Sequence, residues 1–177
     1  MSLGLYLHIP YCFSKCRYCD FYSHPGERGV PEAYVDALLR ELSRFAPEAP
    51  LQPDTLYFGG GTPSLLRPEQ AKRLIDAARP MPGAEITLEA NPETVTEESL
   101  AGFREAGVNR ISFGVQSARD TQLRTLGRPH TAKQARAAFA AARRAGFANI
   151  SGDIMLALPH YTEAEFDETL ELIEGGG

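Results

Sequence analysis

The sequence predicts an α/β fold with a parallel sheet, and three observations support this prediction. Short apolar runs typical of strands alternate with longer runs of helical periodicity. This β/α alternation occurs about five times, and no hairpin signal joins two neighbouring strands. The 177 residues of the chain fall short of the roughly 250 that a complete eight-unit β/α barrel requires. We therefore expect a single domain that forms a partial (β/α) TIM-type barrel over residues 1–177.

The first two β/α units are defined by apolar runs and by prolines. Strands are expected at residues 5–9 and 55–58. The helix between them begins at Pro31, because proline is well tolerated at the first helical position, and it is ended by Pro47, Pro50 and Pro53. Its apolar residues share one face: Tyr34, Val35, Leu38, Leu39, Leu42 and Phe45. The second helix is expected at residues 68–78, with its inward side chains at Leu74, Ile75 and Ala78.

The remaining units are bounded by helix-capping signals. Strands are expected at residues 85–88, 110–113 and 149–156. Three helices begin at capping residues: Thr96, which is followed by two glutamates, and the capping boxes Thr131–Gln134 and Thr162–Glu165. Glycine favours the left-handed conformation that ends many helices. Two of these helices therefore end at Gly107 and Gly146, and the last ends near Glu174.

The composition argues against several classes of function. The chain has 18 Lys and Arg residues against 23 Asp and Glu residues, a formal charge of −5. Nucleic acid needs a basic face, which an acidic chain is poorly suited to provide. No apolar run approaches the ~20 residues of a membrane span. The N-terminal residues also lack the basic start and apolar core of a signal peptide. We therefore expect a cytoplasmic protein with no transmembrane segment and no nucleic-acid partner.

Three cysteines, Cys12, Cys16 and Cys19, lie within eight residues of one another. An odd number so closely spaced is a poor disulfide framework, so the spacing indicates a metal or cluster site. Three thiolates on a [4Fe-4S] cluster, which normally has four cysteine ligands, leave one iron open to a small chelating molecule. A zinc ion is the alternative, and His8 or His24 is available as its fourth ligand. Three buried thiols without any metal are the third interpretation.

Unusual residues stand at the C-terminal end of each predicted strand. The cysteine loop follows the first strand, and Gly-Gly-Gly-Thr-Pro at 59–63, Glu-Ala-Asn-Pro at 89–92 and Gly-Val-Gln-Ser at 114–117 follow the next three. Asp153 belongs to the fifth strand. Because β/α barrels carry their active sites at this edge, we expect these groups to converge on one site. A doubly wound sheet also binds ligands at this edge, but no G-x-G-x-x-G motif follows a strand of this sequence.

The segments His8–Cys12 and Cys19–Phe21 resemble the cluster loop of radical S-adenosylmethionine (SAM) proteins. More narrowly, they resemble the oxygen-independent coproporphyrinogen III oxidase-like group of that superfamily. The resemblance runs from Leu5 to about Thr162 and includes the motifs at 59–65, 89–92, 114–117 and 126–128, together with Asp153 and the pair Leu158-Pro159. It implies that residues 1–177 form a radical SAM core domain that is incomplete.

The resemblance implies a role for each group of residues. The three cysteines bind the cluster, and SAM chelates the open iron through its amino and carboxylate groups. Gly60, Gly61 and Thr62 line the methionine end of SAM, since backbone without a Cβ can approach a ligand closely. Further SAM contacts are implied for Glu89, Gln116, Arg128 and Asp153, with Tyr6 and Tyr18 packed beside the ligand. His8 is expected to be a hydrogen-bonded strand residue.

The implied chemistry is a one-electron cleavage of SAM, which yields a 5′-deoxyadenosyl radical that removes a hydrogen atom from a substrate. We assign no catalytic residue. One branch of the group is a coproporphyrinogen III dehydrogenase of heme synthesis, and the other is a heme chaperone that delivers heme to apoproteins. Cys19 is followed by Asp20-Phe21, as in the chaperone branch, where the dehydrogenase branch has Gly-Cys. Cys12 also lies only twelve residues into the sequence, whereas a longer arm precedes the cysteine loop in the dehydrogenase branch. The chaperone is favoured, and the dehydrogenase is the alternative.

Two features depart from the group. Its Gly-Leu-Pro-Gly motif reads Ala-Leu-Pro-His at 157–160, and the chain has neither a sixth unit nor any Trp, which the chaperone branch carries in a C-terminal heme-binding segment. We therefore expect a fragment or a shortened chain in which the strand at 149–156 is an open edge, with low stability when the cluster is absent. The implied partners are heme or porphyrin, an apo-hemoprotein and an electron donor.

Overall fold

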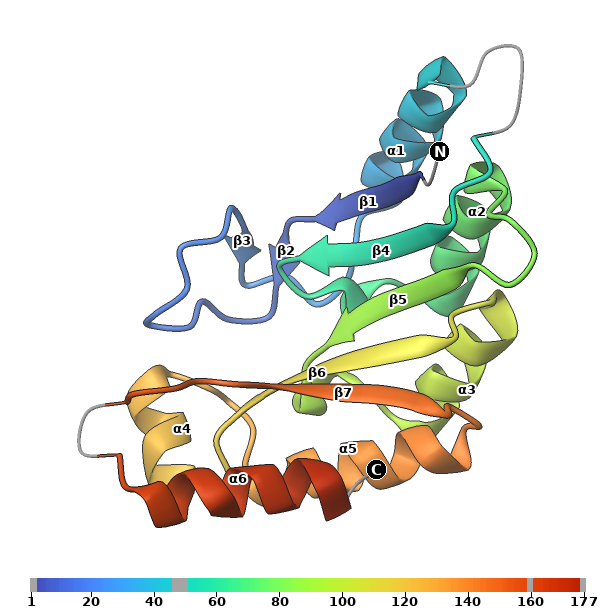
Figure 1. Ribbon diagram of the computed structural model, residues 1–177. Coiled ribbons are helices and arrows are strands. Elements are labelled where there is room, and N and C mark those ends of the chain that lie inside the picture. Colours follow the sequence, from blue (N-terminus) through green and yellow to red (C-terminus); the bar gives the residue numbers. More distant parts are fainter. Residues whose placement is uncertain (1–2, 46–50, 159–160, 176–177) are drawn as a thin grey trace.

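The computed structural model describes residues 3–45, 51–158 and 161–175 (Figure 1). Its centre is a five-stranded sheet with the order β1-β4-β5-β6-β7, in which every neighbouring pair is parallel. The strands are β1 (Gly4–Ile9), β4 (Thr55–Gly60), β5 (Glu85–Ala90), β6 (Arg110–Gln116) and β7 (Asn149–Ile154). Five strands in sequence order with helical crossovers confirm the prediction of a partial β/α barrel.

Five helices connect successive strands of the sheet, and a sixth follows the last described strand (Figure 1). The connecting helices are α1 (Glu32–Phe45), α2 (Pro68–Ala78), α3 (Glu97–Ala106), α4 (Asp120–Leu126) and α5 (Ala132–Arg144), and the sixth is α6 (Glu163–Gly175). Two short 3₁₀ turns, η1 (Pro63–Leu65) and η2 (Pro92–Thr94), follow β4 and β5. The segment after β1 contains a two-residue parallel pair, β2 (Tyr11–Cys12) and β3 (His24–Pro25). This segment lies at the end of the sheet toward which the strand arrows point, and it carries the cysteines.

The predicted helix caps are confirmed by their hydrogen bonds. The Ser99 amide donates to Thr96 Oγ1 at 3.1 Å, and the Gln134 amide donates to Thr131 Oγ1 at 3.2 Å. The reciprocal bonds, from the capping residue's amide to the side chain three positions later, are also present. Thr162 caps α6 in the same way, with Glu165. Gly107 and Gly146 have φ values of 112° and 89°, as the predicted glycine C-caps require.

The strand boundaries differ from the prediction in a way that matters for the site. The middle three strands run on to Gly60, Ala90 and Gln116, so the first residues of the predicted loops are the last residues of strands. Residues that are hydrogen-bonded to a neighbouring strand hold their side chains more rigidly than loop residues do. The fifth strand is shorter than predicted and ends at Ile154 rather than at Leu156.

Three predictions about helices need correction. The first helix begins at Glu32, because the Pro31 carbonyl accepts from the Tyr34 and Val35 amides and Pro31 is therefore the residue before the first turn. Phe45 is 74% exposed and does not belong to the buried face. Pro47 and Pro50, which were expected to end this helix, lie outside the described residues. Helix α4 was not predicted, since its seven residues begin after Arg119, which makes no side-chain cap.

The core lies between the sheet and its helices. Phe58, Leu88 and Phe113 from the sheet are completely buried, and so are Leu74 of α2 and Phe103 of α3. The predicted inward residues of α2 are confirmed, since each is at most 6% exposed. Strand β6 is buried along nearly its whole length, as expected for a parallel strand covered on both faces. This central strand therefore supplies a rigid support for the residues at its C-terminal end.

Strands β1 and β7 form the two edges of the sheet. Within the described residues, β7 pairs with β6 alone, which agrees with the predicted open edge. Among the described segments, no helix is both long enough and apolar enough to cross a membrane.

Candidate functional site

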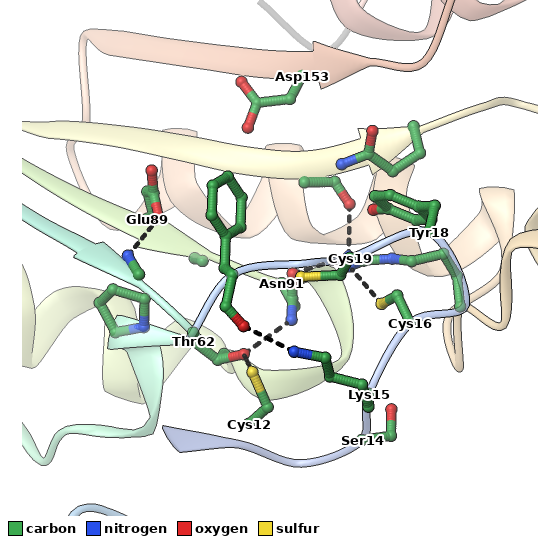
Figure 2. A pocket seen from close by; sticks show the side chains of 18 of the residues that line it. Cys12, Ser14, Lys15, Cys16, Tyr18, Cys19, Thr62, Glu89, Asn91 and Asp153 are labelled. Atoms are coloured by element: carbon green, nitrogen blue, oxygen red, sulfur yellow. Dashed lines mark hydrogen bonds between the residues drawn. The ribbon is translucent and has the colours of Figure 1, made fainter. Parts of the chain in front are cut away.

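A pocket opens at the C-terminal ends of the strands, beneath the cysteine loop (Figure 2). Eleven of the twelve predicted site residues line it: Cys12, Cys16, Tyr18, Cys19, Gly60, Gly61, Thr62, Glu89, Gln116, Arg128 and Asp153. They come from the cysteine loop, from β4 to β7 and from the segment after α4. The expected convergence on one edge of the sheet is therefore observed.

Tyr6 is the predicted residue that does not line this pocket. It lies on the edge strand β1, is 54% exposed, and stacks on Tyr57 with ring centroids 6.0 Å apart. Its hydroxyl hydrogen-bonds with His8 Nδ1 at 3.2 Å. The reason is its position in the register, since Tyr6 pairs with Tyr57 in β4, three residues before the pocket glycine Gly60.

All three cysteines are free thiols, and two of them are contacted from the sheet side. Thr62 Oγ1 donates to Cys12 Sγ at 3.6 Å, and Arg128 Nη1 donates to Cys16 Sγ at 3.4 Å. Among the described residues, no three His, Cys, Asp or Glu side chains converge on a point that suits a single metal ion. A cubic cluster holds each thiolate on a separate iron, so thiols spread around a pocket fit a [4Fe-4S] cluster better than a zinc ion.

The two histidines considered as zinc ligands are engaged elsewhere. His8 Nδ1 hydrogen-bonds with the Tyr6 hydroxyl, and His8 Nε2 lies 3.1 Å from the Tyr22 carbonyl. Both ring nitrogens of His8 therefore have partners, which confirms its prediction as a hydrogen-bonded strand residue. His24 Nε2 lies 3.3 Å from the Tyr22 hydroxyl. These contacts disfavour the zinc interpretation.

The glycines after β4 are required by the protein itself. A Cβ on Gly61 would lie 2.6 Å from the Tyr11 carbonyl oxygen and 3.0 Å from Cys12 Sγ. Gly60 has a φ of 116°, which L side chains rarely adopt. The Gly61 amide donates to the Ile9 carbonyl at 2.9 Å. The sequence interpretation explained these glycines by the approach of a ligand, whereas the structure shows that the backbone of the cysteine loop already occupies the space.

Arg128 joins the cysteine loop to the sheet. Its Nη2 donates to Asn91 Oδ1 and to the Gly114 carbonyl, both at 2.7 Å, and its Nη1 contacts Cys16. Burial alone would lower the pKa of Arg128, but the Tyr18 phenol and other nearby groups raise it above its usual value. Arg128 Nε has no hydrogen-bond partner among the residues that the structure describes. A buried guanidinium thus places a fixed positive charge beside the cysteines.

Two carboxylates face the pocket from the other side (Figure 2). Glu89 accepts from the Tyr57 hydroxyl at 2.8 Å and from the Gly60 amide at 3.2 Å. Its pKa is raised, chiefly by burial and further by the charge of Asp153, although the two hydrogen bonds oppose the shift. Asp153 accepts from the Ser112 hydroxyl at 3.3 Å, and the surrounding protein likewise raises its pKa. Burial also raises the pKa of Tyr18 to about 12.

The sequence assigned no role to eight residues of the pocket lining, and three of these eight are Asn91, Ser112 and Gly114. Asn91 links two predicted residues, since its Nδ2 donates to Thr62 Oγ1 at 3.1 Å and its Oδ1 accepts from Arg128. A signal existed for the other two, because Ser112, Gly114 and Gln116 alternate along one strand and so share one face. The fifth-strand motif was also expected at this rim, but its Pro159 and His160 lie outside the described residues.

Comparisons with known proteins identify the family of this chain. The model of the radical SAM superfamily matches residues 6–173. The heme chaperone HemW of Haemophilus influenzae is 39% identical over 183 residues, which cover 97% of this chain and 48% of that protein. HemW of Escherichia coli is 43% identical over 163 residues, which cover 89% of this chain and 43% of that protein. The chain thus spans less than half the length of these relatives.

Solved structures show the same fold. Coproporphyrinogen III oxidase (HemN) of Escherichia coli, described as a radical SAM enzyme, superposes with a TM-score of 0.87 at 30% identity. That match covers 99% of this chain and 42% of HemN. The cobalamin-dependent SAM radical enzyme OxsB superposes with a TM-score of 0.64 at 16% identity, which shows the fold alone. The pocket, the match over residues 6–173 and the curated relatives establish that the chain belongs to the radical SAM superfamily, whose cofactors are a [4Fe-4S] cluster and SAM.

Proposed function

We propose that this chain is the cluster- and SAM-binding core of a heme chaperone. The observation that carries the proposal is its similarity to curated heme chaperones, at 39% and 43% identity over 97% and 89% of the chain. The residues after the last cysteine, Asp20-Phe21, support the same branch of the family. The proposed partners are heme and an apo-hemoprotein that receives it. A reducing, cytoplasmic setting suits the three free thiols. The one-electron cleavage of SAM requires an electron donor.

Cys12, Cys16 and Cys19 are the proposed cluster ligands. The fit rests on their chemistry and surroundings, since three free thiols share one pocket. Arg128 and Thr62 donate hydrogen bonds to two of the sulfurs and so fix where these side chains lie. When bound, the cluster supplies one electron for the cleavage of SAM. The part of this chain is to hold the thiolates, to orient SAM and to exclude water from the pocket.

The remaining pocket residues are proposed to bind SAM. Glu89 and Asp153 offer carboxylate oxygens that can accept hydrogen bonds from the hydroxyl and amino groups of SAM. Gln116 lies at the C-terminal end of β6 and contributes an amide to the same pocket. Arg128 keeps an unpartnered Nε within the described residues and carries positive charge suited to the SAM carboxylate. Tyr18 packs beside the ligand. Tyr6 does not line this pocket, and its contact with SAM stays a prediction.

Anaerobic reconstitution with iron and sulfide tests the core of the proposal. We expect about four iron and four sulfide atoms per chain, the stoichiometry of the cluster, and a visible absorbance band that changes when SAM is added. The variant Cys16→Ser should lose this cluster, and Ser14→Ala, a change at another residue of the pocket lining, is the matched control. Zinc bound in place of the cluster, or a band insensitive to SAM, would refute the proposal.

A second candidate is coproporphyrinogen III oxidase activity, which the superposition on HemN favours. Two assays on the reconstituted protein separate the candidates. Heme transfer to an apo-hemoprotein, followed by its Soret absorbance, is expected if the protein is a chaperone. Decarboxylation of coproporphyrinogen in the presence of a reductant is expected if it is the oxidase. Decarboxylation without heme transfer would replace the first proposal with the second.

A further inference from the structure

His130 is a buried histidine that the pocket lining does not include. It lies between α4 and α5 and is 2% exposed. Its Nε2 lies 3.1 Å from the Val115 carbonyl oxygen, and because a carbonyl only accepts, this nitrogen carries a hydrogen. Its Nδ1 faces Glu93 Oε2 at 3.3 Å. The imidazole therefore bridges the end of β6 and the 3₁₀ turn η2.

Glu93 and His130 form a buried pair. The Glu93 side chain is 12% exposed and that of His130 is fully buried. Neither Glu93 Oε2 nor His130 Nδ1 has a hydrogen-bond partner elsewhere in the described parts of the chain. Because an unpaired buried polar atom is costly, each of these two atoms is the partner that the other requires.

The Val115 end of this bridge supports a strained turn. The Val115 carbonyl also accepts from the Ser117 amide at 2.9 Å. The pairing of β6 with β7 shifts its register between Gly114 and Gln116. Gln116 has a φ of 68°, in the left-handed region that glutamine rarely adopts. A hydrogen bond from His130 to the carbonyl just before Gln116 therefore stabilises the conformation that brings Gln116 to the pocket.

The Glu93 end of the bridge acts on the guanidinium beside the cysteines. Glu93 lies two residues after Asn91, whose Oδ1 accepts from Arg128 Nη2 at 2.7 Å. Fixing Glu93 thus fixes the short segment that holds Arg128 in place.

We propose that His130 is a positioning residue of the SAM and cluster pocket, which it shapes through Val115 and Glu93 without lining the pocket itself. This inference rests on the proposed function, because SAM is the ligand whose affinity it affects. Its physical basis is the bridge between two pocket-forming segments, the turn that carries Gln116 and the segment 91–93.

Two substitutions of His130 distinguish a positioning role from a general effect on the stability of the fold. His130→Phe keeps a ring but removes both contacts, and we expect the Kd for SAM on the reconstituted chain to rise about 10- to 100-fold. His130→Gln keeps an amide donor for the Val115 carbonyl, and we expect it to restore the affinity to within about threefold of the wild-type value. Phe103→Leu, in the core of α3, is the matched control that lowers stability without changing the Kd.

Hydrogen exchange on the cluster-free chain provides a readout that does not involve SAM. In His130→Phe, exchange at the Ser117 and Met155 amides, which donate to Val115 and Gln116, should be about tenfold faster or more, with β4 amides unchanged. Unchanged exchange at these two amides, or an unchanged Kd for SAM in His130→Phe, overturns the inference. If the wild-type chain binds no SAM, the proposed function fails, and the exchange rates alone decide the role of His130.

Discussion

At the scale of single residues, the site depends on contacts between side chains that lie far apart in sequence. Arg128 reaches Cys16 across 112 positions and Asn91 across 37. These contacts tie the cysteine loop to β5 and β6, so each pocket residue also has a structural role. A substitution in the pocket therefore affects both the fold of the loop and the binding of a ligand, and controls must separate the two effects.

Gly61→Ala should destabilise the cysteine loop. The added Cβ would lie 2.6 Å from the Tyr11 carbonyl, and because that neighbour is backbone it cannot move away cheaply. We expect a loss of about 1–3 kcal/mol in the free energy of unfolding and a lower iron content after reconstitution. Gly29→Ala is the matched control, since its Cβ would meet nothing closer than 3.9 Å. Urea unfolding and iron analysis measure both effects, and equal behaviour of the two variants would contradict this account.

Glu89 and Asp153 should make the cluster-free chain less stable as the pH rises. Both carboxyls have a raised pKa, so the folded chain holds their protons more tightly than the unfolded chain does. Their contribution to stability is therefore full below the unfolded pKa values and is lost as the pH rises through the folded ones. The double variant E89Q/D153N removes this loss, so its stability relative to the wild type should increase between about pH 4 and about pH 7.

Glu165→Gln is the control, because Glu165 should affect stability with the opposite dependence on pH. Hydrogen bonds from Thr162 lower the pKa of Glu165, chiefly through the backbone amide. Its contribution to stability is therefore present above the unfolded pKa and is lost as the pH falls. Urea unfolding across this pH range measures both variants. A pH-independent difference between E89Q/D153N and the wild type would show that the pocket does not perturb these two carboxyls.

At the scale of elements, the capped helices fix where each strand begins and ends. Thr96, Thr131 and Thr162 start α3, α5 and α6, and glycines with positive φ follow α3 and α5. Strands β6 and β7 follow α3 and α5, so the ends of these two helices help to set where the two strands begin. These features are local in sequence, which is why they could be predicted. Helix α4 has no such cap and was missed for that reason.

Thr96→Ala tests how much a helix cap contributes to stability, at a helix whose capping residues do not line the pocket. Removing the Oγ that accepts from the Ser99 amide should cost about 1 kcal/mol of stability. SAM affinity of the reconstituted chain should not change, because neither residue lines the pocket. Thr121→Ala, at an exposed position within α4, should be close to neutral and serves as the control. A change in SAM affinity without a change in stability would contradict a purely local role for the cap.

At the scale of the whole molecule, the sheet has the curvature of a barrel with an open side. Strand β7 is bonded to one neighbour, and its other edge presents unpaired backbone groups in the described structure (Figure 1). Exposed edges of this kind promote pairing with other chains. The predicted low stability of the cluster-free chain follows from this edge and remains to be tested.

We expect the cluster-free chain to aggregate on heating, at a rate that rises with concentration. Ile154→Lys places a charge on the open strand β7 and should slow this aggregation. Leu156→Lys, which adds the same charge at an exposed position just beyond the strand, is the matched control and should have a smaller effect. Light scattering during thermal unfolding measures both rates. A cooperative, concentration-independent transition at high temperature would contradict the prediction.

The sequence alone determined the β/α order, the helix caps and the groups at the strand ends, since apolar periodicity and capping depend on neighbours a few residues apart. Eleven of the twelve site residues that it predicted line the pocket. The tertiary structure decided that Tyr6 lies outside, that Asn91 joins Thr62 to Arg128, and that His130 meets Glu93. These contacts depend on strand register and on side chains from separate β/α units, and no local pattern records which of them meet.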